Sequence, residues 1–205
     1  MSRVVHVVDD DAAVRASLRF LLESAGFTVA DHATAEAFLR TTEGENVGCV
    51  LTDVRMPGLD GLGLQARLAA GGRGIPVIVM TGHGDVPTAV QAMKVGALDF
   101  LEKPFDDEQL LDAVRRALAA GDATRAAEAV VAAAVARLAT LTPREREVLE
   151  GMAAGQASKE IARDLGASPR TIEVHRMRVM EKLQVRSLPE LVRLVQAARG
   201  ASRQA

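Results

Sequence analysis

Two hydrophobic patterns alternate along the first 118 residues. Short apolar runs rich in β-branched residues lie near 3–8, 27–31, 47–52, 75–80 and 98–101. Apolar residues recur with helical spacing near 11–25, 34–43, 60–70, 85–95 and 106–119. Short continuous apolar runs are typical of buried strands in a parallel sheet. Five strand–helix units of this length predict an α/β fold, a doubly wound five-stranded parallel sheet with the strand order 2-1-3-4-5.

The remaining residues are helical in pattern throughout. Residues 120–140 are rich in alanine, the strongest helix former, and predict a helical linker. One side of this linker carries the apolar residues Val131, Val135 and Leu138. They either face a partner or belong to a spacer with no role in association, and the sequence leaves both possibilities open. Four helices are then expected, the first opened by Thr142 as N-cap, Pro143 and Glu145 in a capping box. We therefore predict domains at 1–119 and 141–205, joined by a linker at 120–140.

Charge and cysteine content narrow the class of protein. The chain has one cysteine, Cys49, so a disulfide framework is excluded and a cytoplasmic protein is expected. No apolar stretch reaches the roughly 20 residues that span a bilayer, and no signal peptide is evident. Residues 1–120 carry 11 Lys and Arg against 17 Asp and Glu, whereas residues 121–205 carry 14 against 10. The acidic part suits a cation site, and the basic part suits a polyanionic partner.

Three carboxylates follow two of the predicted strands. Asp9 and Asp10 come after the first run, and Asp53 comes after the third. In an open α/β sheet, ligands bind at the carboxyl ends of the strands, so we expect these side chains to converge there. Such carboxylates repel one another and suit Mg2+, which prefers oxygen ligands. A carboxylate beside a divalent ion can attack phosphorus and form an acyl phosphate.

Four motifs follow one another along the first part of the chain. They are Val-Val-Asp-Asp-Asp at 7–11, Thr-Asp-Val-Arg-Met-Pro-Gly at 52–58, Met-Thr-Gly-His-Gly at 80–84 and Asp-Phe-Leu-Glu-Lys-Pro-Phe at 99–105. With them, residues 1 to about 118 resemble the flavodoxin-like receiver domain of two-component response regulators. The resemblance implies that Asp53 takes a phosphoryl group from a sensor histidine kinase. It also implies a Mg2+ site formed by Asp10, Asp53 and the Arg55 carbonyl, with Asp9 acting through water. The implied phosphate-binding and switch residues are Thr81, Phe100 and Lys103, and we expect a cis bond between Lys103 and Pro104.

The basic part carries the pattern of a helix-turn-helix. Two short helical segments are joined by Leu-Gly-Ala-Ser at 165–168, and the second ends in a basic run. This part of the chain resembles the LuxR-type DNA-binding domain in two segments, Leu-Thr-Pro-Arg-Glu-Arg-Glu-Val-Leu at 141–149 and Thr-Ile-Glu-Val-His at 171–175. The helix at 169–183 is then expected in the major groove, with Ile172, Val179 and Leu183 facing the core. The expected DNA-binding residues are Lys159, Arg170, Thr171, Glu173, Val174, His175, Met177, Arg178 and Lys182.

Within this helix the expected roles differ. Glu173 is expected to accept a hydrogen bond from the N4 amino group of cytosine, and Val174 to contact a thymine methyl group. The residues expected to contact phosphates are Thr171, His175, Arg178 and Lys182. The open alternative for Glu173 is a surface ion pair with Arg170 or Arg176.

Together the two parts resemble response regulators of the FixJ type, on motifs that include Gly-His-Gly-Asp-Val-Pro at 82–87. The resemblance implies a transcriptional activator of nitrogen-fixation or microaerobic genes, acting on promoter DNA and RNA polymerase downstream of an oxygen-sensing kinase. It also implies a homodimer formed on phosphorylation, with Val90, Met93 and Lys94 at the interface. No enzyme activity is expected. One alternative is an aspartate-based phosphohydrolase, which would need a general acid where Arg55 stands. The other is a constitutive DNA-binding regulator whose receiver serves only for dimerisation.

Overall fold

The computed structural model describes residues 3–42, 47–72, 74–82 and 86–201. The chain forms two compact units, Met1–Arg125 and Ala126–Ala205. Residues 83–85 lie outside the described residues. The motif residues His83 and Gly84 and the expected helix start at 85 therefore have no structural description.

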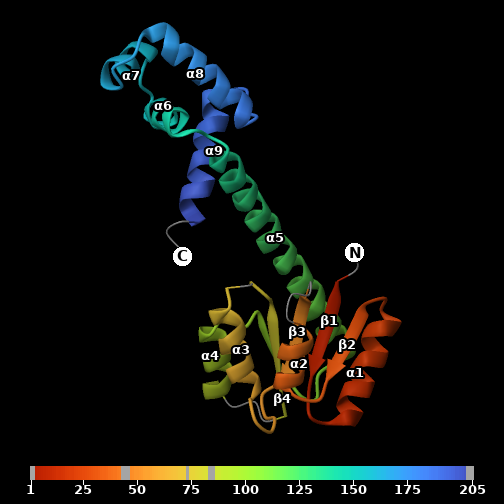
Figure 1. Ribbon diagram of the computed structural model, residues 1–205. Helices are drawn as coiled ribbons and strands as arrows, with labels where there is room; N and C mark the ends of the chain where they lie inside the picture. The colour runs from red at the N-terminus through yellow and green to blue at the C-terminus, as the bar shows by residue number, and fades with distance from the viewer. Residues whose placement is uncertain (1–2, 43–46, 73, 83–85, 202–205) are drawn as a thin grey trace. The chain divides into compact units, whose positions relative to one another are not determined.

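A parallel five-stranded sheet forms the centre of the first unit (Figure 1). Its strands are β1 Val4–Val8, β2 Thr28–His32, β3 Val47–Asp53, β4 Val77–Thr81 and β5 Asp99–Glu102. They lie in the order β2-β1-β3-β4-β5, which confirms the predicted order. Val8 pairs with His32 on one side and Thr52 on the other, and Asp53 pairs with Met80. The carboxyl ends of β1 and β3 are therefore neighbours.

Helices cover both faces of this sheet, as a doubly wound fold requires. The helices are α1 Ala12–Ser24, α2 Ala35–Thr41, α3 Gly61–Ala70, α4 Val86–Lys94 and α5 Asp107–Ala139. On one face, Leu22 of α1 and Val114 of α5 pack in a core with Val7 of β1. On the other, Phe38 of α2 and Leu64 of α3 pack with Val8. Neighbouring residues of β1 thus point into different cores, which explains why the strand is apolar at nearly every position.

The helix α5 corrects one expectation. The predicted helix at 106–119 does not end there but continues without a break through the expected linker, to Ala139. Gly121 lies inside this helix, where it packs closely against neighbouring side chains. A Cβ at Gly121 would lie 3.1 Å from Pro76 Cγ and 3.0 Å from Arg125 Nη2. The division between the two compact units falls inside this helix, after Arg125.

In the described part of the second unit, helices are the only regular elements. Besides the end of α5 it contains α6 Pro143–Ala153, α7 Ser158–Asp164, α8 Pro169–Lys182 and α9 Leu188–Ala201. The predicted capping box is present: the Thr142 side chain accepts from the backbone N–H of Glu145, and Glu145 Oε2 accepts from that of Thr142. Ile172, Val179 and Leu183 are fully buried in the core, as predicted for the inner side of α8.

Among the described helices, none combines the length and the apolar character needed to cross a membrane.

Candidate functional site

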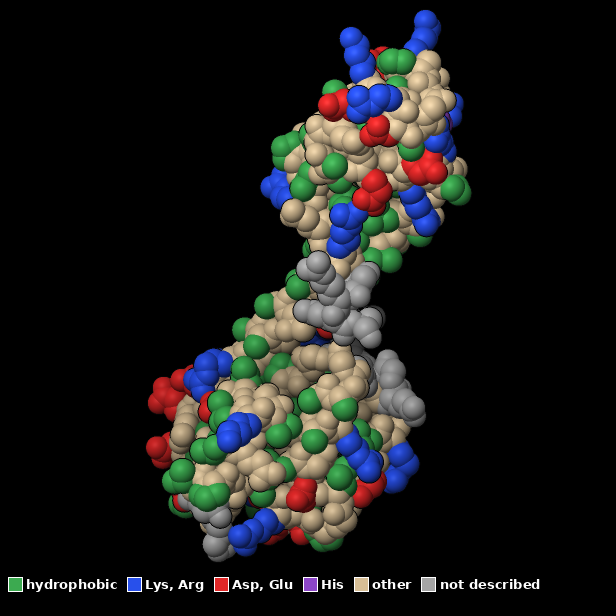
Figure 2. All heavy atoms as spheres, turned by 90° about the vertical axis from the view of Figure 1, so that its left-hand side faces the viewer, with side chains coloured by type: hydrophobic (Ala, Val, Ile, Leu, Met, Phe, Trp, Pro, Cys, Tyr) green, Lys and Arg blue, Asp and Glu red, His purple; other side chains and the backbone are tan. Residues whose placement is uncertain are grey.

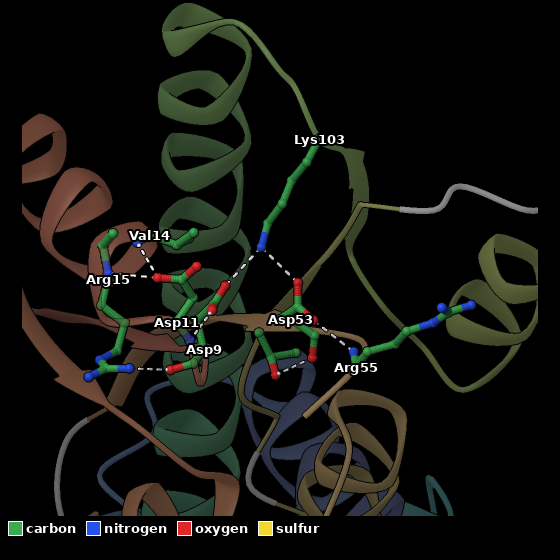
Figure 3. Close-up of polar contacts among 9 residues, drawn as sticks. Asp9, Asp11, Val14, Arg15, Asp53, Arg55 and Lys103 are labelled. Atoms are coloured by element: carbon green, nitrogen blue, oxygen red, sulfur yellow. Dashed lines mark hydrogen bonds and ion pairs between the residues drawn. The ribbon is translucent and has the colours of Figure 1, made fainter. Parts of the chain in front are cut away.

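The structure brings three of the predicted site residues together at the carboxyl edge of the sheet. Asp9 follows β1, Asp53 is the last residue of β3 and Lys103 follows β5. Lys103 Nζ lies 2.8 Å from Asp9 Oδ2 and 2.7 Å from Asp53 Oδ1 (Figure 3). One ammonium group therefore links two carboxylates that come from residues 94 and 50 positions away in sequence.

The charge of Lys103 is stabilised by this arrangement. Burial lowers the pKa of the ammonium group, but the hydrogen bonds and charges of Asp53 and Asp9 outweigh burial and leave that pKa above its ordinary value. The Asp9 side chain is only 2 % exposed and that of Asp53 13 %, so little water screens the two ion pairs. The site therefore holds a permanent cation between two carboxylates.

Asp9 is fixed at every polar atom. Its N–H donates to the His32 carbonyl, and its own carbonyl accepts from Arg15 Nη1 at 2.7 Å. Its Oδ1 accepts from the N–H of Asp11 at 2.9 Å, and Oδ2 binds Lys103. Asp9 therefore cannot turn without breaking several hydrogen bonds at once.

Asp10 is not drawn into this cluster. Its side chain is exposed and, among the described residues, no three acidic, histidine or cysteine side chains lie close enough to hold a metal ion. The expected gathering of Asp9, Asp10 and Asp53 is thus only partly present: Lys103 holds two carboxylates and the third stays in solvent. This is the arrangement that like-charge repulsion favours when a single ammonium balances the site.

The loop after Asp53 is held close to its carboxylate. The N–H of Arg55 donates to Asp53 Oδ2 at 2.7 Å, which holds the backbone just before the Arg55 carbonyl, the one expected to bind metal. Farther along the loop, the N–H of Leu59 donates to Glu36 Oε1 on α2 at 3.0 Å. Sequence reasoning missed both Glu36 and Arg15, because each acts on backbone atoms and matches no motif.

Of the three expected phosphate-binding and switch residues, Thr81 and Lys103 lie at this carboxyl edge, and Phe100 lies farther back in β5. Thr81, the last residue of β4, is buried, and its carbonyl accepts from the N–H of Lys103 at 2.7 Å. The bond between Lys103 and Pro104 is cis, as expected. Phe100 in β5 is half-buried and packs against the core beneath α2, α3 and α4.

The expected dimer surface is exposed in the first unit. Val90 is 45 % and Met93 52 % exposed on α4, and Lys94 is exposed beside them. Figure 2 views this unit from the side of α3 and α4 and shows hydrophobic side chains among basic and acidic ones on that face. Such an apolar surface is available for association.

The outer side of α8 carries the expected base-contacting residues. Arg170, Glu173, Val174 and Met177 are all exposed, and Met177 is 65 % exposed. Within the described part of the chain, Glu173 forms no ion pair with Arg170 or Arg176; Arg176 instead donates to the Gln156 carbonyl at 3.5 Å. These four residues are therefore accessible on one side of the helix.

Several expected phosphate-contacting residues have other contacts in the structure. Lys182 Nζ lies 2.7 Å from the buried Glu145, so it has a structural partner that the sequence did not predict. Thr171 Oγ1 lies 2.8 Å from Ser168 Oγ at the N-cap of α8. His175 is half-buried, whereas Lys159 and Arg178 are exposed. Lys159 and Arg178 therefore fit the phosphate role more directly than Lys182.

Buried Cys49 has no role in the site. Burial raises the pKa of its thiol to about 12, so it remains a neutral core residue.

Comparison with known proteins agrees with this geometry. Residues 5–115 match the response regulator receiver domain, and residues 139–195 match the luxR family of bacterial regulatory proteins. The chain is 53 % identical over 194 residues to the transcriptional regulatory protein FixJ of Bradyrhizobium diazoefficiens, covering 95 % of each chain. It is 55 % identical over 190 residues to FixJ of Azorhizobium caulinodans, covering 93 % of this chain and 90 % of the relative.

Solved structures give the same relationship. Full-length FixJ from B. japonicum is 52 % identical and matches with a TM-score of 0.59 over 97 % of this chain and 98 % of that one. The response regulator StyR is 44 % identical and matches with a TM-score of 0.87 over 96 % of this chain and 99 % of that one. The chain therefore belongs to the two-component response regulators that join a receiver domain to a LuxR-type DNA-binding domain.

Proposed function

We propose that this response regulator is switched on when Asp53 accepts a phosphoryl group from a sensor histidine kinase. The observation that carries the proposal is the contact of Lys103 with both Asp53 and Asp9. It places a cation where negative charge would develop during phosphoryl transfer, and electrostatic stabilisation of this kind dominates that reaction.

The transfer itself would be a displacement at phosphorus. A carboxylate oxygen of Asp53 forms the new bond to phosphorus, and the bond to the kinase histidine breaks, which returns the electron pair to its ring nitrogen. Asp53 Oδ2 accepts a hydrogen bond from Arg55, which fixes the orientation of the carboxylate. The hydroxyl of Thr81 and the ammonium of Lys103 would then bind phosphoryl oxygens.

A Mg2+ ion fits the residues present. Asp9 and Asp53 already share one cation, and Asp10, the next residue after Asp9, carries a further carboxylate that is exposed and has no competing partner among the described residues. We propose that Asp10, Asp53 and the Arg55 carbonyl hold the ion, with Asp9 acting through water. The metal would neutralise charge on the transferring group.

The output would be transcription activation at promoter DNA. Phosphorylation would favour pairing of two receivers through Val90, Met93 and Lys94, so that two copies of α8 can reach two half-sites about one DNA turn apart. The DNA-bound dimer would then recruit RNA polymerase. Relatives at 50–55 % identity carry the name FixJ. We therefore propose nitrogen-fixation or microaerobic genes as targets, controlled by an oxygen-sensing kinase in the cytoplasm.

The phosphoacceptor can be tested by intact-mass measurement after incubation with acetyl phosphate and Mg2+. Wild type should gain one phosphoryl group, and Asp53→Asn should gain none because its amide is not a nucleophile. Asp112→Asn, which alters a surface carboxylate on α5, is the control and should behave as wild type. A fully labelled Asp53→Asn variant would overturn the assignment. DNA affinity that does not change on labelling would favour the constitutive regulator instead.

A further inference from the structure

We infer that Arg15 is a positioning residue of the phosphoacceptor site, which it serves by fixing the backbone that carries Asp10. The inference rests on the proposed Mg2+ site and adds a residue that no part of that proposal uses. Arg15 would touch neither the metal nor the phosphoryl group. It acts on the peptide between Asp9 and Asp10.

Arg15 supplies a hydrogen-bond donor to the backbone at the end of β1. The pairing of β1 with β2 ends at Val8 and His32, so the carbonyl of Asp9 lies beyond the strand ladder. A backbone carbonyl in a buried residue needs a donor. Arg15 Nη1 reaches it from the first turns of α1 at 2.7 Å (Figure 3). This guanidinium therefore replaces the donor that a longer β2 would have supplied.

A second carboxylate holds Arg15 itself in place. Its side chain is only 16 % exposed, and its Nε lies 3.4 Å from Asp31 Oδ2 in β2. Asp31 also accepts from Arg19 Nη1 at 2.6 Å. Among the described residues Arg15 Nε makes no hydrogen bond, so Asp31 attracts the guanidinium by charge, whereas Nη1 donates to the Asp9 carbonyl. Partners that orient metal ligands in this way usually matter for metal affinity.

Asp10 depends on this backbone more than Asp9 does. Asp9 has its own side-chain hydrogen bonds, whereas within the described residues the Asp10 side chain makes no hydrogen bond or ion pair. The peptide between the two residues is planar, so a fixed Asp9 carbonyl also fixes the start of Asp10. The hydrogen bond from the N–H of Asp11 to Asp9 Oδ1 holds the backbone on the far side of Asp10, so loss of Arg15 would free the peptide on the near side.

The charge of Arg15 and its positioning role predict opposite effects on Mg2+. A positive charge near a cation site weakens cation binding, so removal of the charge alone should raise the affinity for Mg2+. Loss of positioning should weaken it, by about tenfold for a residue that orients a ligand. The sign of the change therefore separates the two roles.

The experiment is a calorimetric titration of Mg2+ into unphosphorylated full-length protein. Arg15→Met should weaken Mg2+ affinity about tenfold. Arg19→Met is the matched control, because it removes the same charge from the same helix and the same Asp31 but does not contact Asp9. It should leave the affinity within about twofold or tighten it slightly. Arg15→Lys keeps the charge with a single donor group, and should recover part of the affinity.

The outcomes separate this inference from the function on which it rests. If wild type binds no Mg2+, the proposed metal site fails. If wild type binds and Arg15→Met binds equally or more tightly, the metal site stands and the positioning role is overturned. If Arg15 has a purely structural role, Arg15→Met should unfold at a lower temperature but should bind Mg2+ with unchanged affinity at a temperature where the variant is folded. That result would also overturn the inference.

Discussion

The ammonium group of Lys182 at the end of α8 lies 2.7 Å from Glu145 Oε2 at the start of α6, and Glu145 is buried. The same carboxylate accepts from the N–H and the hydroxyl of Thr142. One buried oxygen therefore ties the expected DNA-reading helix to the cap of another helix. Its partners, Lys182 first and the Thr142 backbone second, hold the pKa of Glu145 at about 2.

This ion pair predicts that Lys182 contributes to folding. Lys182→Met should lower the free energy of unfolding of the second unit by about 1–3 kcal/mol, because a buried carboxylate loses its charged partner. Chemical unfolding followed by circular dichroism measures the loss. The double variant Lys182→Met with Glu145→Gln should recover part of it. A stable Lys182→Met protein with weakened DNA binding would instead support the original phosphate role.

The same pair predicts an acid-dependent loss of stability. Glu145 has a pKa of about 2 in the folded protein against an ordinary 4.5, so the unfolded chain binds a proton more readily between those values. The contribution is fully present above about pH 4.5 and is lost as pH falls towards about 2. Lys182→Met should reduce this dependence, and an unchanged slope would count against the pair.

A buried histidine pair predicts pH dependence at a higher range in the receiver. His6 Nδ1 lies 3.0 Å from His32 Nε2, and burial, with the nearby His32, lowers the pKa of His6 from 6.5 to about 4. The unfolded chain then binds the proton more readily, so stability falls as pH drops from about 6.5 to about 4. The full difference is on the order of 3 kcal/mol. Urea unfolding at several pH values should show this loss, reduced by half or more in His6→Gln.

Lys103 is expected to compete with Mg2+ for the same carboxylates. Lys103→Met should therefore tighten Mg2+ binding by about three- to tenfold, or about 0.6–1.4 kcal/mol, while it abolishes the transcriptional response to phosphorylation. Lys94→Met removes an equal charge from exposed α4 and serves as the control for the titration. Weaker Mg2+ binding in Lys103→Met would show that the lysine supports the metal site instead of opposing it.

The exposed face of α4 is expected to mediate dimerisation. Val90→Asp would place a charge in an apolar interface and should weaken association of the phosphorylated protein by at least about 2 kcal/mol if the residue is central. Sedimentation velocity with a phosphodonor measures the change. Phe20→Asp, at a 75 % exposed site on α1, introduces the same charge elsewhere and should leave the dimer intact. Full dimerisation of Val90→Asp would exclude this face.

The second unit is expected to bind promoter DNA alone. Residues 126–205 retain the buried Ala134 of α5 and omit the acidic receiver, whose charge opposes binding to a polyanion. This fragment should bind without phosphodonor. In it, Glu173→Ala should relax base preference by about 1–3 kcal/mol at one position, whereas Glu181→Ala on the same helix should not. Unchanged sequence preference in Glu173→Ala would make Glu173 an ordinary surface residue.

Local patterns made most of the fold predictable. The alternation of strands and helices gave the sheet order, and Thr142 and Glu145 form their capping box because both lie within one turn. Motif spacing also identified the residues that meet at Lys103. The end of the receiver helix was predicted wrongly, because the change to an alanine-rich composition at 120 was taken as the start of a separate linker, whereas one helix runs from Asp107 to Ala139.

Contacts between distant residues that belong to no motif could not be predicted from the sequence. Lys182 and Glu145 are 37 residues apart, and the sequence of a basic helix does not show which of its basic side chains pairs with a buried carboxylate. The hydrogen bond from Arg15 to Asp9 ends on a carbonyl, which every residue has. The exposure of the Asp10 side chain depends on the three-dimensional positions of the charges around it, and the spacing of residues along the sequence does not give these positions.

The approach of Gly61 to Asp53 limits how this receiver can vary. A Cβ at Gly61 would lie 2.1 Å from the Asp53 carbonyl oxygen, far inside van der Waals contact. Saturation mutagenesis should therefore find that no side chain is accepted at position 61 without displacing the main chain of Asp53, even though Gly61 contributes no reactive group. A library that seeks receivers with altered signalling lifetimes would do better to keep this glycine constant and to vary the exposed neighbours of Asp53 instead.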